Sequence, residues 1–168
     1  MRFSAYGRPE PLDKTRKFLE SKFKNAGNVN LDYVVALRST GEFIGLCGSH
    51  QRKGDLGWPA IGYQFVKESW GRGYATEAVG ALMDAYWALP REECEVSVDK
   101  STVREMEGDG SGDGLVQECV IALTEEDNAG SKNVLRKCGF ELEKKWVEPD
   151  LRDPTVDIEL LGYVARRK

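Results

Sequence analysis

The spacing of hydrophobic residues in the middle of the chain changes from a strand pattern to a helix pattern near residue 70. Residues 61–66 (IGYQFV) are rich in aromatic and β-branched types, which predicts a β-strand. Downstream, apolar residues recur at i, i+3, i+4, i+7, i+8 and i+11: Ala75, Ala78, Val79, Leu82, Met83 and Tyr86. This spacing predicts an amphipathic helix over 75–89, closed by Pro90. Gly71 and Gly73 therefore lie in the turn between strand and helix.

The same criteria, applied to the rest of the chain, predict a mixed α+β fold. We expect a helix at 12–24, a second helix that begins after the N-cap Asn128 and ends at Gly139, and strands at 31–38, 42–51, 60–66, 117–123, 140–148 and 155–165. Short turns at 39–41 and 55–59 make the first three strands an antiparallel meander, and the last two strands should also pair antiparallel. The predicted order is helix, three strands, helix, strand, helix, two strands.

Residues 91–116 follow neither hydrophobic period. They are charged and rich in glycine, so we expect a flexible insertion here, most mobile at 105–114, within a single domain of residues 1–168. The run from Asp109 to Gly114 resembles the start of an EF-hand calcium loop. Its twelfth position, which requires a bidentate Glu, is Val120, so we expect no calcium site.

Composition narrows the class of protein. The net charge of −4 argues against a nucleic-acid surface, which normally carries a basic patch. The sequence lacks a secretory signal and a long apolar run, so we expect a cytoplasmic protein without a membrane partner. The four cysteines are scattered, which predicts free thiols. Cys47 and His50 form a C-x-x-H pair without a second ligand pair, so we expect no metal.

The turn at 71–75 has the chemistry of an anion site. A helix start leaves N–H groups without intrahelical partners, and the helix dipole places partial positive charge there. Gly71 and Gly73 lack a Cβ, Ala75 keeps the first helical turn open, and Arg72 can add a charge-assisted contact. Two glycines can equally make a tight turn and nothing more, and spacing alone does not separate these two interpretations.

Two sequence blocks resemble a known family. The block IGYQFVKESWGRGYATEA resembles the acetyl-CoA signature Q/R-x-x-G-x-G/A of the GNAT superfamily of N-acetyltransferases; Gly73 and Ala75 match, and Trp70 stands where the family usually has Gln or Arg. The second block, from Asn128 and Ser131 to Phe140, is similar to the N-x-x-S…L-x-K-x-G-F helix of the branch that includes ribosomal-protein N-terminal acetyltransferases. The resemblance covers residues 31–166.

This resemblance implies a GNAT-like, mostly antiparallel sheet flanked by helices. The sequence departs from the family at its start, because the family usually has a strand and a helix before the element expected at 12–24 and there is no room for them here. The resemblance also implies that acetyl-CoA is the co-substrate. The residues implied to bind it are Phe65, Val66, Lys67, Trp70, Gly71, Arg72, Gly73, Tyr74, Ala75, Thr76, Asn128 and Ser131.

The implied reaction is direct attack of an amine on the thioester, without a covalent acyl-enzyme. The amine must lose a proton, and the departing thiolate needs a proton or a hydrogen bond. Leu135 stands where many relatives have a tyrosine that serves as the acid, and Ala60 stands where the branch often has a glutamate base. Ser131 can donate to the sulfur instead. Catalytic candidates are Ser131, Asn128 and Tyr63, with Tyr63 or His50 as a possible base through water.

Three functions compete at this stage. The first is an N-acetyltransferase that acts on a protein N-terminus or a small amine, as a monomer or homodimer. The second is a catalytically weak or inactive acyl-CoA-binding domain, because the usual acid and base are missing. The third is a nucleotide-phosphate binder of another fold, which lacks the P-loop Lys-Ser/Thr and the acidic residue of a dinucleotide site.

Overall fold

The computed structural model describes Lys17, residues 31–104 and residues 116–167. Its elements are β1 (Leu31–Ala36), β2 (Phe43–Gln51), β3 (Ala60–Phe65), α2 (Tyr74–Trp87), β4 (Cys119–Glu125), α3 (Ala129–Lys137), β5 (Glu141–Asp150) and β6 (Asp153–Arg166). Two 3₁₀ turns, η1 (Lys67–Ser69) and η2 (Lys100–Thr102), interrupt the loops. The predicted order of elements is confirmed from β1 onward, whereas the helix expected at 12–24 lies outside the described residues.

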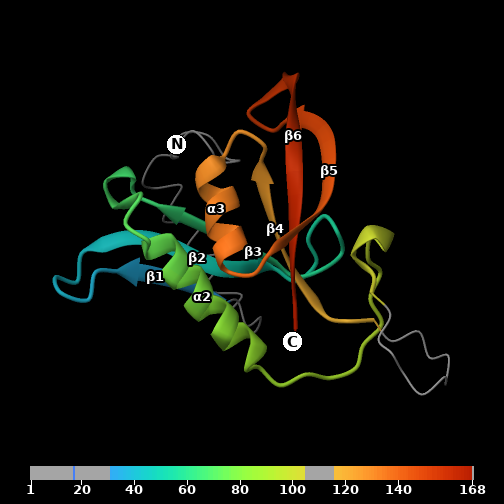
Figure 1. Ribbon diagram of the computed structural model, residues 1–168, viewed down its shortest axis with the longest axis horizontal. Helices are drawn as coiled ribbons and strands as arrows, with labels where there is room; N and C mark the ends of the chain where they lie inside the picture. Colours follow the sequence, from blue (N-terminus) through green and yellow to red (C-terminus); the bar gives the residue numbers. More distant parts are fainter. Residues whose placement is uncertain (1–16, 18–30, 105–115, 168) are drawn as a thin grey trace.

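The six strands form one sheet in the order β1-β2-β3-β4-β6-β5 (Figure 1). The predicted meander of β1, β2 and β3 is confirmed, as is the antiparallel pairing of β5 with β6. The parallel contact is between β3 and β4, in the middle of the sheet. The mixed, mostly antiparallel α+β architecture is therefore the one that the sequence predicts.

The parallel pair is the feature that positions the site. β3 and β4 register at one pair of residues, Ala60 and Ile121, and the Ile121 N–H donates to the Pro59 carbonyl at 2.9 Å. From there the two strands diverge toward their C-terminal ends (Figure 1). Parallel strands end at the same edge of a sheet, so α2, which follows β3, and α3, which follows β4, both begin at this edge.

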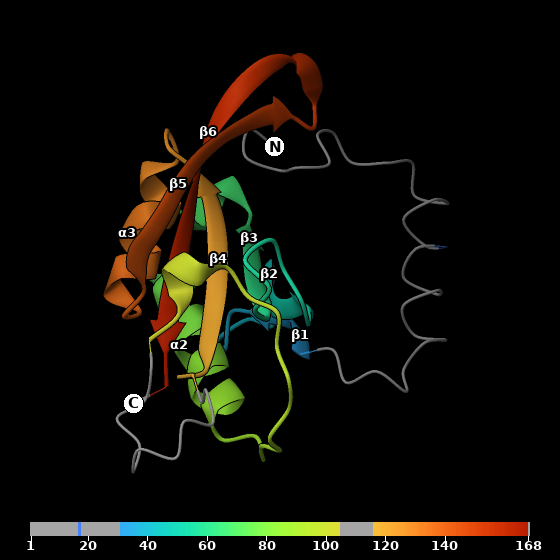
Figure 2. The ribbon, with the colours of Figure 1, turned by 90° about the vertical axis from the view of Figure 1, so that its right-hand side faces the viewer.

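Helices α2 and α3 lie on the same side of β4 (Figure 2). They share one apolar cluster with the sheet: Cys47, Ile61, Val79, Leu82, Met83, Tyr86, Val120, Ala122, Leu135, Phe140, Leu161, Tyr163 and Ala165. A second cluster contains Leu56, Trp58, Ala60, Cys119, Ile121 and Val164. Burial of this much apolar surface is the main force that holds both helices against the sheet.

Part of the segment predicted as a flexible insertion packs against the second cluster. Thr102 in η2 is fully buried, and its hydroxyl accepts a hydrogen bond of 2.8 Å from the Trp58 indole. Val98 contacts the same cluster. Residues 105–115 lie outside the described part of the chain, so the flexibility of the insertion and the single-domain organisation stay predictions.

Candidate active site

The glycine turn before α2 has the conformation that an anion site requires. Gly71 and Gly73 have φ values of 73° and 87°, which favour glycine because other residues meet steric strain there. A Cβ placed on either glycine would meet no atom within 4 Å. The space in front of both glycines is therefore open, as the approach of a phosphate to the backbone demands.

The first turn of α2 carries no side-chain cap. Gly73 is the N-cap, it makes no side-chain hydrogen bond, and its carbonyl accepts from Glu77 N–H at 3.0 Å. The N–H groups of Tyr74, Ala75 and Thr76 precede the first intrahelical donor, so helix geometry gives them no helical acceptor. Together with the helix dipole, they make this end of α2 attractive to a negatively charged group.

Trp70 fixes the loop that leads to the glycines. Its indole N–H donates to the Phe65 carbonyl at 2.9 Å, and its main-chain N–H donates to the Lys67 carbonyl at 3.1 Å. The Trp70 side chain is nevertheless 55% exposed. Lys67 and Arg72 are also exposed; with Glu68 between them, the loop keeps one net positive charge. Phe65 and Val66 connect β3 to this loop and are half-buried.

The start of α3 is capped as predicted. The Asn128 side-chain oxygen accepts a hydrogen bond of 3.1 Å from the Ser131 N–H. At the other end, Gly139 has a φ of 82° and Phe140 N–H returns to the Leu135 carbonyl at 3.0 Å. The structural roles predicted for Asn128 and Gly139 are thus confirmed. Asn128 also holds Ser131 in the first turn, at the sheet edge that α2 shares.

Tyr63 on β3 connects directly to this first turn. Its hydroxyl donates to the Ser131 carbonyl at 3.3 Å, across the region where β3 and β4 diverge. Burial raises the pKa of Tyr63 to about 12, so the phenol stays protonated near neutral pH. A protonated phenol donates hydrogen bonds but cannot accept the amine proton. Tyr63 therefore fits a positioning role better than the role of a base.

The two positions where relatives carry an acid or a base are apolar in this chain, and the candidate base His50 lies away from Ser131. Leu135 is 1% exposed and belongs to the apolar core. Ala60 is buried at the start of β3. His50 lies near the C-terminal end of β2, next to the start of β3, because Ser49 registers with Ile61 and Gln51 with Ala60. That is the opposite end of β3 from the glycine turn, so the backbone does not bring His50 to Ser131.

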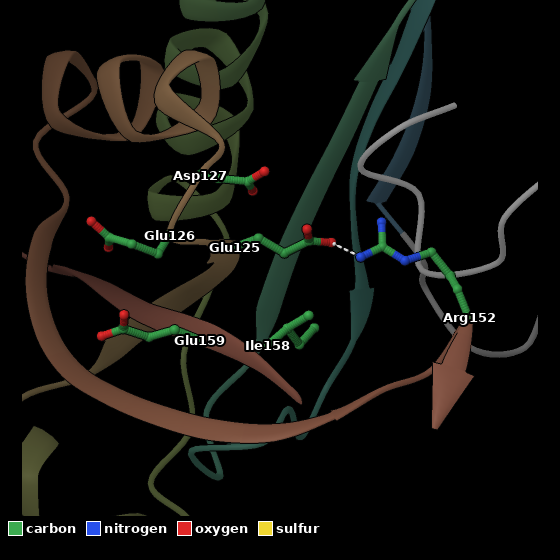
Figure 3. A pocket seen from close by; sticks show the side chains of 6 residues that line it. All are labelled: Glu125, Glu126, Asp127, Arg152, Ile158 and Glu159. Atoms are coloured by element: carbon green, nitrogen blue, oxygen red, sulfur yellow. Dashed lines mark ion pairs between the residues drawn. The ribbon is translucent and has the colours of Figure 1, made fainter. Parts of the chain in front are cut away.

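A surface cavity of about 270 Å³ lies beside the start of α3 (Figure 3). It is lined by Glu125, Glu126, Asp127, Arg152, Ile158 and Glu159. Arg152 pairs with Glu125 at 2.8 Å, and Lys132 pairs with Glu126 at 3.1 Å. The hydrogen bond from Lys132 lowers the pKa of Glu126, so this carboxylate is a weak base. The signal in the sequence for this feature is the run of three consecutive acids at the end of β4, Glu125 to Asp127.

Three further findings concern the described part of the chain. None of its helices is both long and apolar enough to cross a membrane. Its residues also include no group of three or more His, Cys, Asp or Glu side chains that could hold a metal ion. The four cysteines are free, as the sequence predicts, and burial raises the pKa of the Cys47 thiol to about 12.

Comparison with protein families identifies the class to which this site belongs. Residues 1–141 match the acetyltransferase (GNAT) domain family. The chain belongs to this family, and the sequence-based resemblance is confirmed.

Two curated bacterial proteins are similar over part of their length. The chain is 36% identical over 52 residues to the uncharacterized N-acetyltransferase p20 of Bacillus licheniformis, a match that covers 31% of the chain and 29% of that protein. It is 34% identical over 73 residues to the uncharacterized protein YkkB of Bacillus subtilis, covering 42% of each. The matches therefore span less than half of either relative.

Solved structures share the fold at low sequence identity. The GNAT-family acetyltransferase from Bacillus anthracis superposes with a TM-score of 0.66 at 18% identity, covering 99% of this chain and 80% of that one. The ribosomal-protein-S5-alanine acetyltransferase from Vibrio fischeri gives 0.60 at 16%, covering 90% and 69%. The microcin C7 self-immunity acetyltransferase MccE, solved with acetyl-CoA and AMP, gives 0.62 at 18%, covering 94% and 73%.

Proposed function

We propose that this chain is an N-acetyltransferase that moves the acetyl group of acetyl-CoA to a primary amine, either a protein N-terminus or a small amine, by direct attack. The observation that carries the proposal is the open, uncapped start of α2 behind Gly71 and Gly73, at the same sheet edge as Ser131. Membership of the GNAT family supports the cofactor, and so does a structural neighbour solved with acetyl-CoA.

The residues present fit the charged part of acetyl-CoA. Gly71 and Gly73 leave room for a pyrophosphate, and the first N–H groups of α2 can donate to it. Lys67 and Arg72 supply cations in the same loop, which the net charge of −4 makes necessary, because the chain as a whole repels a polyanion. Phe65, Val66, Trp70, Tyr74, Ala75, Thr76, Asn128 and Ser131 complete the proposed cofactor site.

The chemistry requires one bond to form and one to break. Acetyl-CoA supplies an activated thioester: the amine nitrogen bonds to the acetyl carbon, the carbon–sulfur bond breaks, and the proton lost by nitrogen is matched by one gained by the thiolate. In this proposal the Ser131 hydroxyl donates a hydrogen bond to the leaving sulfur, and Asn128 and Tyr63 hold the turn that carries Ser131. An α-amino group, with a pKa of about 7.7–8.0, needs little help to lose its proton.

The second function to consider is an acyl-CoA-binding domain with weak or no catalysis. Leu135 in the core offers no proton, and the high pKa of Tyr63 removes it as a base. An acyl-CoA-binding domain would use the same cofactor site as the proposed N-acetyltransferase. The two functions differ only in the rate of acetyl transfer.

Calorimetry with CoA, combined with a thiol-release assay over a panel of amines and N-terminal peptides, separates the two functions. An N-acetyltransferase binds CoA, and its rate of thiol release from acetyl-CoA rises with the concentration of one or more acceptors. Binding of CoA without acceptor-dependent thiol release favours the binding domain. A chain that does not bind CoA contradicts both.

A further inference from the structure

Trp70 is unusual for a large aromatic side chain, because it is both exposed and fixed. More than half of its surface is open to solvent, at 55%, yet its indole N–H makes a 2.9 Å hydrogen bond to the Phe65 carbonyl. This hydrogen bond spans η1, which lies between Phe65 and Trp70. Within the same segment, the Ser69 N–H donates to the Val66 carbonyl at 3.0 Å. The buried part of the ring and the single hydrogen bond to Phe65 together hold the Trp70 side chain in place, and the indole N–H is the one polar group through which it does so.

The carbonyl that Trp70 binds points away from the β2 side of β3. The Phe65 carbonyl and the Val66 N–H belong to one trans peptide group, so they point in opposite directions. Val66 N–H donates to the Ile44 carbonyl of β2 at 3.0 Å. The Phe65 carbonyl thus points toward the side of β3 on which β4 lies.

At this level β4 has already diverged, because the two strands register at Ala60 and Ile121 alone. An unpaired strand end is free to fray, and the loop that follows it would move with it. The indole takes the place of the missing strand partner at the last residue of β3. It ties the end of the strand to the residue immediately before Gly71.

We infer that Trp70 is a positioning residue for acetyl-CoA: its indole N–H, through the Phe65 carbonyl, holds the glycine turn in the conformation that presents the first N–H groups of α2. This role rests on the proposed function. It assigns to the indole donor a contribution to cofactor affinity that is independent of any contact between the ring and the cofactor. Loss of the donor lets the turn sample other conformations, and the apparent affinity falls by the fraction of molecules that leave the binding-competent one.

Two substitutions separate the donor from the ring. Trp70→Phe keeps an aromatic ring but removes the N–H, whereas Trp70→Gln removes the ring but keeps an N–H donor at the position where the family usually has Gln or Arg. Trp146→Phe is the matched control, because it deletes an indole N–H that also donates at 2.9 Å, to Glu148 on β5, away from the turn. All three proteins are compared with the wild type for CoA dissociation constant, for KM and kcat with acetyl-CoA, and for Tm without ligand.

We expect Trp70→Phe to weaken CoA binding by about 3- to 10-fold, the range of one net hydrogen bond, with a matching rise in KM and little change in kcat. Trp70→Gln should bind CoA more tightly than Trp70→Phe, because it restores an N–H donor, and Trp146→Phe should not change CoA affinity. Unchanged affinity in Trp70→Phe, or equal weakening in Trp70→Phe and Trp70→Gln, overturns the role of the donor. A wild-type protein that fails to bind CoA overturns both this role and the proposed function.

Discussion

The Tyr63 hydroxyl on β3 and the Ser131 carbonyl in the first turn of α3 lie 3.3 Å apart, in hydrogen-bond contact across the divergence of β3 and β4. Sixty-eight positions separate the two residues in sequence. The contact joins β3, which leads to the glycine turn, with the first turn of α3. That turn carries Ser131, the proposed hydrogen-bond donor to the leaving sulfur. The contact adds a polar link between the two halves of the site to the apolar cluster that α2 and α3 share.

Replacing Tyr63 with Phe tests this link. The substitution keeps the buried ring and removes the hydroxyl, so we expect a loss of about 0.5–1.5 kcal/mol in the free energy of unfolding. Because the first turn of α3 loses an anchor, kcat should fall while the CoA dissociation constant changes little. Urea unfolding and steady-state kinetics measure the two effects. A variant with wild-type kcat would show that Tyr63 supports the fold alone.

The pH dependence of stability provides a second readout of Tyr63. Burial raises its pKa to about 12, above the usual value near 10. Between these two values the unfolded chain releases the proton and the folded chain retains it, so the contribution of Tyr63 is complete below pH 10 and is lost as the pH rises toward 12. Tyr86 and Cys47 have similarly raised pKa values, so the wild type minus Tyr63→Phe difference isolates Tyr63. Equal slopes for the two proteins above pH 10 would contradict this assignment.

The phosphate role of the glycine turn is tested by Gly73→Val. The new side chain enters the space in front of α2, so CoA should no longer raise Tm, although it stabilises the wild type as any ligand selective for the native state does. Strain also lowers stability, because a left-handed backbone costs a non-glycine residue about 1–2 kcal/mol.

Gly41→Val is the matched control for that strain. Gly41 has a φ of 72° and, like Gly73, nothing within 4 Å of a built Cβ, but it lies in the hairpin between β1 and β2. We expect both variants to lose a similar amount of stability and Gly41→Val alone to keep its CoA-induced shift in Tm. A wild-type CoA-induced shift in Tm for Gly73→Val would show that the pyrophosphate does not bind at this turn.

Local patterns in the sequence predict the elements of the site but not the contacts between them. The change of period near residue 70 places α2, and the chemistry of Asn128 and Gly139 places both ends of α3. The Trp70–Phe65 and Tyr63–Ser131 hydrogen bonds depend on how far β3 and β4 diverge, which is a tertiary property without a local signature. The flexibility of 105–114 and the expected monomer or homodimer stay predictions.

The sequence pattern did not predict that part of the insertion is buried. Thr102→Val tests the hydrogen bond that holds this part of the insertion against the second cluster. Thr102 reads as one polar residue in a charged loop, yet its hydroxyl is the acceptor for the Trp58 indole. Valine has nearly the same shape, so the substitution leaves the Trp58 N–H without this partner in the second cluster. The expected cost is about 1–3 kcal/mol of unfolding free energy.

Thr155→Val serves as the control for the same chemical change at the surface. Thr155 is exposed, and its hydroxyl donates a hydrogen bond to Asp153 at 2.6 Å. We expect it to change stability by no more than about 0.5 kcal/mol. Similar small effects in both variants would indicate that η2 is not anchored by Thr102.

The proposed catalytic role of Ser131 makes the most specific prediction about mechanism. Ser131→Ala removes the hydroxyl and leaves intact the main-chain N–H that Asn128 caps and the carbonyl that Tyr63 binds. The fold and the cofactor site should therefore persist. If the hydroxyl acts on the departing sulfur in the transition state, kcat falls and the CoA dissociation constant stays the same. Serine is a poor acid, so the loss should be at or below about 10²-fold, the low end for general-acid catalysis.

Asn128→Asp is the matched variant, because aspartate caps helices as well as asparagine does and leaves the Ser131 hydroxyl in place. We expect it to keep the wild-type stability, because the Ser131 N–H retains its capping acceptor, so the two variants separate the capping role of residue 128 from the role of the Ser131 hydroxyl. Steady-state kinetics against a working acceptor, with CoA calorimetry on the same samples, distinguish the outcomes. A normal kcat in Ser131→Ala refutes the catalytic role, whereas a weaker CoA dissociation constant with normal kcat assigns the hydroxyl to cofactor binding.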